Sequence, residues 1–244
     1  MKYSIIVKDL VKSYGELLAL DSFSMRCHER KIYALLGPNG SGKTTLIKCL
    51  FGLLPFTRGE ISILGRSVPH ELPHIYKKLG YMPQDYSLYE DLTVRENLEF
   101  FGNLYGFEGD KLDERISKVS ELVQLEEKMD SLFRELSGGL KRRLSLATTL
   151  LHNPEVIMAD EPTVGIDPIL RVNFWRHFRE LNRRGVTFLI TTHIMDEVMK
   201  ADFVGFIAKG KLIAEGPPKR LMEEYDEKDI EGVFLKKLEA RSYG

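Results

Sequence analysis

The sequence predicts an α/β fold with a mainly parallel sheet into which a helical segment is inserted. A glycine-rich phosphate-binding motif at residues 37–44 lies between an apolar, strand-like run and a helix-like run. Strand and helix patterns alternate between residues 156 and 208, which is typical of a parallel sheet. From about residue 85 to residue 151, helical periodicity replaces the strand signals. With 244 residues, the chain is long enough for one full core and an inserted lobe.

Four strands are expected before residue 66. They are residues 3–7, 23–27, 31–36 and 59–65. The second alternates apolar and polar side chains, and the fourth is bounded by glycines. A turn at residues 14–16, centred on Gly15, separates the first two strands. Five apolar residues mark the helix after the phosphate-binding motif: Leu46, Ile47, Leu50, Leu53 and Leu54.

Three helices are expected in the inserted segment. The first begins at a capping box formed by Thr93 and Glu96. One side of this helix carries Leu98, Phe101, Leu104 and Tyr105. The second helix is marked by Ile116, Val119, Leu122 and Val123. The third spans residues 140–151 and stops before the Asn153-Pro154 pair.

The last third of the chain returns to strands. They are expected at residues 156–159, 186–192 and 203–208. Between the first two lies a helix that starts at Pro168 and ends before Gly185. A short amphipathic helix follows in the tail, around Ile230, Val233, Phe234 and Leu238. The pattern leaves open whether this helix packs on its own domain or contacts a partner.

Residues 37–44, Gly-Pro-Asn-Gly-Ser-Gly-Lys-Thr, form a complete P-loop, or Walker A motif. Its glycines allow backbone N–H groups to surround phosphate oxygens, and the following helix N-terminus adds positive potential. Lys43 can reach the β- and γ-phosphates, and the Thr44 hydroxyl can bind Mg²⁺. An ordinary glycine-rich turn does not need this spacing. We therefore expect a nucleoside triphosphate site formed by Gly37, Pro38, Asn39, Gly40, Ser41, Gly42, Lys43, Thr44 and Thr45.

A second cluster lies at the end of the strand expected at 156–159, where Asp160 and Glu161 are adjacent. Successive side chains on a strand point to opposite faces, so the two carboxylates need not share a task. One can hold Mg²⁺ while the other polarises the water that attacks the γ-phosphate. On its own this pair is equally compatible with a solvated acidic strand end. Beside a P-loop in a parallel-sheet pattern, it predicts a catalytic pair.

Composition excludes several classes of protein. The 35 basic and 36 acidic residues leave a net charge of −1, so the overall charge gives no sign of nucleic-acid binding and leaves open only a local basic patch. Cys27 and Cys49 have no metal-binding or redox spacing and are expected to be core thiols in a reducing compartment. No secretion signal and no apolar run of about 18 residues is found. We expect a soluble chain, for which a partner supplies any membrane span.

Residues 136–143, Leu-Ser-Gly-Gly-Leu-Lys-Arg-Arg, complete a set of motifs by which the chain resembles the nucleotide-binding domains of ATP-binding cassette (ABC) proteins. The resemblance covers about residues 3–220 within an ATPase domain of residues 1–220, and it leaves residues 221–244 as a helical tail. It implies a P-loop NTPase core of the RecA-like type, an N-terminal antiparallel β subdomain, and an inserted helical subdomain at about 85–151. Leu140 stands where many members have glutamine, and Ala159 is smaller than the usual branched residue. Neither position bears on the chemistry.

Ser137, Gly138 and Gly139 precede a helix, so a hydroxyl and backbone amides can form a second anion site there. A plain N-cap would explain Ser137 alone. In the family that the chain resembles, two domains pair head to tail, and this motif closes over the γ-phosphate held by the other domain. The resemblance therefore implies that Ser137–Gly139 contact ATP bound to a partner subunit.

Four further residues match motifs of the family. Tyr14 matches the aromatic that stacks on adenine, and Gln84 matches the glutamine that reaches Mg²⁺ and the attacking water. Asp167 matches the loop that crosses the dimer interface, at a position that also suits an N-cap. His193 matches the histidine that senses the γ-phosphate, although a lone histidine is more often structural. With Lys43 and Glu161, these residues make both sites of a homodimer competent for hydrolysis.

The implied function is that of an ATP-hydrolysing subunit of an ABC exporter, with ATP and Mg²⁺ bound. Residues 91–97, 163–168 and 231–235 resemble the branch whose membrane subunit is a separate chain. The partners implied are a polytopic permease and a second ATPase subunit, identical or different, at the cytoplasmic side of the cell membrane. Contact with the permease is expected at residues 84–107, where the aromatics are Tyr86, Tyr89, Phe100, Phe101, Tyr105 and Phe107.

Two other classes compete with this interpretation. A soluble ABC-type ATPase acting on nucleic acid or the ribosome usually carries two cassettes or a long coiled-coil insertion, and this chain has neither. A P-loop kinase or GTPase would leave Ser137–Gly139, Gln84 and His193 unexplained, and the Asn-Lys-x-Asp segment of a GTPase is missing. The transported substrate is not predicted.

Overall fold

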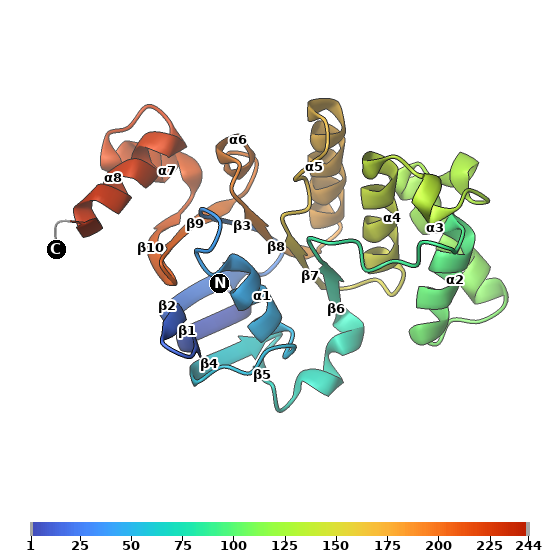
Figure 1. The fold of residues 1–244 in the computed structure, drawn as a ribbon, viewed down its shortest axis with the longest axis horizontal. Helices are drawn as coiled ribbons and strands as arrows, with labels where there is room; N and C mark the ends of the chain where they lie inside the picture. Colours follow the sequence, from blue (N-terminus) through green and yellow to red (C-terminus); the bar gives the residue numbers. More distant parts are fainter. Residues whose placement is uncertain (1, 243–244) are drawn as a thin grey trace.

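Two β-sheets form the centre of the computed structural model, which describes residues 2–242 (Figure 1). The first sheet is antiparallel, with strand order β2-β1-β4-β5. Its strands are β1 (Tyr3–Tyr14), β2 (Leu17–His28), β4 (Arg58–Ile63) and β5 (Arg66–Val68). The N-terminal antiparallel subdomain implied by the resemblance is therefore present.

Strands β1 and β2 are longer than the sequence pattern indicated. Their pairing contains register shifts, for example between Val7 and Leu10. Asp9 and Ser22 have positive φ angles of 46° and 51°, so the alternation of inward and outward side chains is broken there. The predicted first strand ends at residue 7 because the alternating pattern ends there. The turn at Gly15, with φ 58°, lies between the two strands as expected.

The second sheet has the order β10-β9-β3-β8-β7-β6, and only the β9–β10 pair is antiparallel. Its strands are β3 (Ile32–Leu36), β6 (Leu79–Met82), β7 (Val156–Asp160), β8 (Thr187–Thr192), β9 (Phe203–Ala208) and β10 (Lys211–Gly216). All residues of β3, β7 and β8 are buried. Such strands appear in sequence as continuous apolar runs, which explains why they were predicted. The short β5 and β6 and the half-buried edge strand β10 were missed.

The central strand β3 contributes to two hydrophobic cores. Ile32, Ala34 and Leu36 belong to the core shared with the helical lobe and the C-terminal helices. Tyr33 and Leu35 belong to the other core, which includes the antiparallel sheet and α1 (Lys43–Leu50). The parallel sheet thus lies between two apolar layers. Helix α1 ends at Leu50 because Gly52 takes a φ of 64°; Leu53 is exposed, so the prediction that Leu53 and Leu54 extend this helix was wrong.

The inserted lobe contains α2 (Val94–Leu104), α3 (Asp110–Val123) and α4 (Gly138–Leu150). The capping box of Thr93 and Glu96 is formed at the start of α2. Leu98 on α2 is buried, but Leu104 is 68% exposed, so Leu104 does not share the buried side as predicted. The lobe lies at one end of the molecule, beside α5 (Pro168–Arg183) (Figure 1).

Three further helices follow: α6 (Met195–Val198), α7 (Pro218–Tyr225) and α8 (Ile230–Ser242). Ile230, Val233 and Phe234 of α8 are buried, and the Phe234 ring lies 5.4 Å from that of Phe206 on β9. These three residues of the tail helix therefore pack on its own domain, and a partner contact through its other residues stays a prediction. The predicted boundary at residue 220 falls inside α7. Within residues 2–242, no helix is long and apolar enough to cross a membrane.

Candidate functional site

The P-loop leaves the carboxyl end of β3 and enters α1. Gly42 caps this helix with a φ of 109°, and a Cβ there would lie 2.5 Å from the carbonyl oxygen of Ala19. A Cβ on Gly37 would lie 2.4 Å from the carbonyl oxygen of Ile207. Only glycine fits these two positions, because neither the backbone conformation nor the neighbouring main chain leaves room for a side chain. Thr44 and Thr45 lie in the first turn of α1 and are half-buried.

Lys43 is buried although it carries a charge. Its Nζ donates to the carbonyl oxygens of Gly37 (2.7 Å) and Pro38 (3.0 Å). The same Nζ lies 3.1 Å from Oε1 of Glu161, whose side chain is 5% exposed. The lysine is thus held between its own loop and the segment that follows β7. The amine is placed where phosphate oxygens of a nucleotide in the P-loop would meet it.

Glu161 also contacts His193. Its Oε2 lies 3.2 Å from Nδ1 of the histidine, whose side chain is 38% exposed. His193 follows β8, Glu161 follows β7, and Lys43 follows β3, all at the carboxyl edge of neighbouring parallel strands. Ligands of open α/β sheets bind at this edge. The structure therefore joins these three predicted residues in one cluster.

The backbone of Glu161 has an unusual conformation for a residue other than glycine, with φ at 48°. Its N–H donates to the carbonyl oxygen (3.1 Å) and to Oγ1 (3.0 Å) of Thr191 on β8. Its carbonyl oxygen accepts from Nη2 of Arg142 at 2.9 Å and from the Val164 amide at 3.3 Å. Strained backbone of this kind persists where surrounding contacts over-determine it, and it concentrates at functional sites.

Asp160 takes a different direction from its neighbour. It is fully buried, and its Oδ1 accepts a short hydrogen bond from Oγ1 of Thr191, while its Oδ2 has no partner. This agrees with the expectation that Asp160 and Glu161 have separate contacts. Oγ of Ser41 in the P-loop is likewise buried without a partner.

Asp160 and the P-loop hydroxyls fit a Mg²⁺ ion that arrives with a nucleotide. No group of three or more His, Cys, Asp or Glu residues within residues 2–242 is arranged to hold a metal by itself. Mg²⁺ in nucleotide sites usually needs only one or two protein ligands, since phosphates and waters supply the rest. The unpartnered carboxylate oxygen of Asp160 would suit such a role, and a hydroxyl such as that of Thr44 would suit a second.

Arg142 on α4 was not predicted as a functional residue, yet it is 2% exposed and donates to four carbonyl oxygens. They belong to Pro83 (2.9 Å), Gln84 (2.9 Å), Glu161 (2.9 Å) and Pro162 (2.8 Å). Gln84 itself is exposed, and its backbone rather than its amide makes this contact. Arg142 lies among buried α4 residues spaced at helical intervals, Gly139, Leu146 and Thr149. A basic residue on an apolar helical stripe is the signal that could have identified it.

Glu197 on α6 is a second residue that the sequence analysis missed. This fully buried carboxylate accepts hydrogen bonds from Oγ1 of Thr163, after β7, and from Oγ1 of Thr192 (2.8 Å), at the end of β8. Nε of Arg171 on α5 lies 3.7 Å away. Glu197 thereby joins the segments that carry Glu161 and His193.

Ser137–Gly139 lie at the start of α4, apart from the cluster around Lys43. Ser137 is the N-cap, and its Oγ accepts from the Leu140 amide at 3.4 Å. The Gly138 carbonyl accepts from the hydroxyl of Tyr86 at 3.1 Å. In the described part of the chain, no hydrogen bond joins these three residues to the P-loop.

The remaining two predicted residues lie at the edges of the site. Tyr14 ends β1 and is 47% exposed, and Nζ of Lys12 lies 5.0 Å from the centre of its ring. An exposed ring at this hairpin is free to stack on a flat ligand. Asp167 is the N-cap of α5, with Oδ1 accepting from the Leu170 amide at 3.0 Å. The N-cap expectation for Asp167 is thus confirmed.

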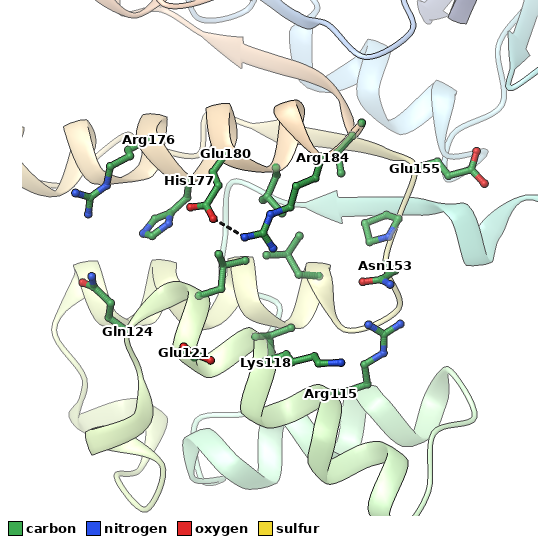
Figure 2. A pocket seen from close by; sticks show the side chains of 17 residues that line it. Arg115, Lys118, Glu121, Gln124, Asn153, Glu155, Arg176, His177, Glu180 and Arg184 are labelled. Atoms are coloured by element: carbon green, nitrogen blue, oxygen red, sulfur yellow. Dashed lines mark hydrogen bonds and ion pairs between the residues drawn. The ribbon is translucent and has the colours of Figure 1, made fainter.

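A groove of about 870 Å³ lies elsewhere, between α3 and α5 and beside the end of α4 (Figure 2). Its walls carry charged side chains of both signs, among them Arg115 and Lys118 on α3, Glu180 on α5 and Arg184 directly after α5. Glu180 and Arg184 pair with each other, and Lys118 pairs with Glu114. None of the predicted site residues lines this groove.

Comparison with known proteins decides the family. Residues 20–164, more than half of the chain, match the ABC transporter family. The chain belongs to the ABC transporter family. Two sequence relatives and one solved structure illustrate this.

The chain is 39% identical over 236 residues to the probable multidrug ABC transporter ATP-binding protein YbhF of Escherichia coli K12, covering 95% of this chain and 41% of YbhF. It therefore spans about two fifths of that relative. It is 42% identical over 217 residues to the Nod factor export ATP-binding protein I of Burkholderia lata, covering 88% of this chain and 71% of the relative.

Among solved structures, the cassette resembles MJ0796 in a dimeric post-hydrolysis state bound to ADP and Pi. The TM-score is 0.80 with 26% sequence identity, over 87% of this chain and 98% of that one. The predicted P-loop NTPase fold and the predicted family are thus both confirmed.

Proposed function

We propose that this ABC cassette binds and hydrolyses ATP as the energy-supplying subunit of an exporter. The observation that carries the proposal is the cluster of Lys43, Glu161 and His193 at the carboxyl edge of β3, β8 and β7. It places a phosphate-binding amine, a carboxylate and an imidazole within contact of one another beside a P-loop. These are the groups that phosphoryl transfer to water requires.

Each residue has a role that follows from its position. The P-loop amides and Lys43 bind the phosphates, and Tyr14 stacks on the adenine. Glu161 accepts a proton from the attacking water, and His193 and Gln84 orient that water and contact the γ-phosphate. Mg²⁺, held by Thr44 and Asp160, neutralises charge on the phosphate oxygens.

The proposed working unit is a head-to-tail dimer in which Ser137–Gly139 of one subunit contact the ATP held by the other. Ile169 and Val172, next to Asp167 on α5, are apolar but 77% and 59% exposed. They stand one helical turn apart, so they present one apolar face close to the loop expected at the dimer interface. The relative MJ0796 is a dimer in its solved structure.

The second partner proposed is a permease at the cytoplasmic side of the cell membrane. Of the aromatic residues at 84–107, Phe101 and Phe107 pack against the lobe's core, and Tyr105 stacks on His152. Tyr89 (49% exposed) and Phe100 (36% exposed) remain at the surface with their ring centres 4.7 Å apart. This exposed pair suits a short apolar helix of a membrane subunit. Export is supported by the name of the Nod factor export relative, and a transport role is also supported by the multidrug transporter name of YbhF.

The test of hydrolysis is phosphate release by the purified chain with Mg-ATP, compared with Glu161→Gln. Loss of turnover with retained ATP binding is expected for the variant. Equal turnover in both proteins would contradict the role of Glu161.

The test of the permease partner is a pull-down of the tagged chain from solubilised membranes of its native host. A polytopic membrane protein in about one-to-one amount is expected. Recovery of ribosomes or nucleic acid without a membrane chain would contradict the exporter proposal and leave only the ATPase.

A further inference from the structure

Arg142 connects three segments that no strand pairing holds together. The parallel ladder between β6 and β7 ends with Met82 and Ala159. Beyond that pair, the segment of Gln84 and the segment of Glu161 are both bonded by the Arg142 guanidinium. Arg142 itself belongs to α4, which begins with the Ser137–Gly139 motif.

The guanidinium is held by backbone rather than by acidic side chains. It makes four charge-assisted hydrogen bonds to carbonyl oxygens, and its Cζ lies 5.3 Å from the centre of the Tyr86 ring. The Tyr86 hydroxyl returns to the Gly138 carbonyl, so the same side chains tie the start of α4 to the Gln84 segment. A buried cation with this many satisfied donors allows few alternative arrangements.

Arg142 contacts Glu161 at a position where the backbone is strained. Thr191 holds the N–H of this left-handed residue, and Arg142 makes the shorter bond to its carbonyl oxygen. The other bond to that oxygen, from Val164, is local and moves with the segment. Without Arg142, the segment is still held by Thr191 and by the bond from Thr163 to Glu197, but the carbonyl oxygen of Glu161 loses its shorter bond. We expect the strained peptide to relax between these contacts and to move the carboxylate relative to Lys43 and His193.

We propose that Arg142 is a positioning residue for hydrolysis: it holds Glu161 and the Gln84 segment in register with α4 of the same subunit. This inference rests on the proposed function and extends it. In the proposed dimer, the motif at the start of α4 contacts the ATP held by the partner subunit, whereas Glu161 serves the ATP held by its own subunit. When the partner's site closes and shifts α4, Arg142 transmits that shift to Glu161. The two ATP sites of a dimer are coupled by this route.

The variants are Arg142→Ala and Arg142→Lys, with Arg143→Ala as the matched control. Lysine keeps the charge but lacks the planar fork that spans two segments. Arg143 is the next residue on α4, and its guanidinium bonds the Gln124 carbonyl of the lobe at 3.3 Å. If neither Arg142 variant folds, Arg142 is structural and the proposal is overturned.

The first measurement is hydrogen–deuterium exchange, which needs no ATPase activity. Arg142→Ala and Arg142→Lys should both speed exchange in residues 82–86 and 161–164, with the exchange of β3 and β8 unchanged. Arg143→Ala should leave both segments at the wild-type rate. Unchanged exchange at residues 161–164 in the Arg142 variants would overturn the proposal, whether or not the wild type hydrolyses ATP.

The second measurement compares kinetics. Both Arg142 variants should lower kcat by about a hundredfold with KM for ATP unchanged, because misplacement of a catalytic group by about 1 Å has that effect. A rise in KM with kcat retained would place the effect on ATP binding and overturn the positioning role. An inactive wild type would instead contradict the proposed function, and the exchange result would still decide the role of Arg142.

Mixed dimers decide in which subunit Arg142 acts. With R142A on one chain and E161Q on the other, action within the subunit predicts near-complete loss, because neither glutamate is both present and positioned. With both substitutions on one chain, beside a wild-type chain, the activity should equal that of E161Q paired with wild type. The reverse pattern would show that Arg142 acts on the partner's site, and it would overturn the proposal.

Discussion

Lys43 and Glu161 form a buried ion pair, with Nζ 3.1 Å from Oε1 and side chains only 4% and 5% exposed. The carboxylate therefore has two neighbours at once, the P-loop lysine and His193. Phosphate oxygens that attract Lys43 compete with Glu161 for the same amine. In the proposed function, nucleotide binding would therefore be linked through Lys43 to release of the Glu161 carboxylate, which could then act as a base.

The first prediction concerns this pair. Lys43→Ala should abolish ATP binding and should lower the free energy of unfolding, by at most about 3–5 kcal/mol, because the buried Glu161 carboxylate loses its lysine partner and keeps His193. Adding Glu161→Gln should restore part of that loss. Urea unfolding of both single variants and the double variant measures the coupling. Lys48→Ala, an exposed position on the same helix, is the control. If the two substitutions change the free energy of unfolding by strictly additive amounts, the Lys43–Glu161 ion pair does not contribute to stability.

The second prediction is that Glu161→Gln traps an ATP-bound dimer. The amide cannot accept the proton from water, so ATP stays in place and the contacts of Ser137–Gly139 persist. Light scattering with and without Mg-ATP should show a doubling of mass for the variant. Glu155→Gln, an exposed position one residue before β7, should behave as wild type. A variant that stays monomeric with ATP would contradict either the base assignment or the head-to-tail dimer.

Much of this site could be predicted because its chemistry is local in sequence. The P-loop and the Asp160-Glu161 pair each follow a continuous apolar run, and parallel strands bring their carboxyl ends to one edge. That edge explains why Lys43, Glu161 and His193 meet.

Arg142 could not be found in the same way. Its four partners are carbonyl oxygens, which any residue type supplies, and the nearest of them is 19 positions away in sequence. Glu197 was not predicted for a similar reason, since its bond to Thr163 spans 34 positions of the sequence. In the fold, β6 and β10 were missed because a four-residue strand and a half-buried edge give little periodic signal.

The third prediction tests the surface assigned to the permease. Tyr89→Asp should abolish transport in reconstituted vesicles, while ATP hydrolysis by the isolated subunit is retained. The reason is that a carboxylate at the exposed Tyr89–Phe100 pair would lose its hydration against an apolar helix. Tyr76→Asp replaces a tyrosine of similar exposure outside residues 84–107 and should keep transport. Parallel loss of transport and hydrolysis in Tyr89→Asp would indicate misfolding of the lobe rather than a lost contact.

The fourth prediction concerns pH. Burial lowers the pKa of His152, whose Nε2 lies 2.9 Å from the Leu79 carbonyl and whose ring stacks on Tyr105. In the unfolded chain a histidine titrates at about pH 6.5. As pH falls below that value, His152 binds a proton in the unfolded state but stays neutral in the folded state, where its pKa is lower. The free energy of unfolding therefore decreases with falling pH until the lower folded pKa is reached, by at most about 1.4 kcal/mol per pH unit for this residue.

Urea unfolding at about pH 7.5 and about pH 5.5 measures this slope. His152→Gln keeps an amide donor toward Leu79 but cannot titrate in this range, so the variant should lose less stability between the two pH values than wild type. Burial also lowers the pKa of His177, which adds a contribution of the same sign, so His152→Gln should retain part of the slope. The double variant with His177→Gln should retain less still.

Loss of the ring stack lowers the stability of His152→Gln at both pH values and leaves the difference between them interpretable. An identical pH dependence in wild type and His152→Gln would show that His152 takes up its proton equally in both states, contrary to the effect of its burial.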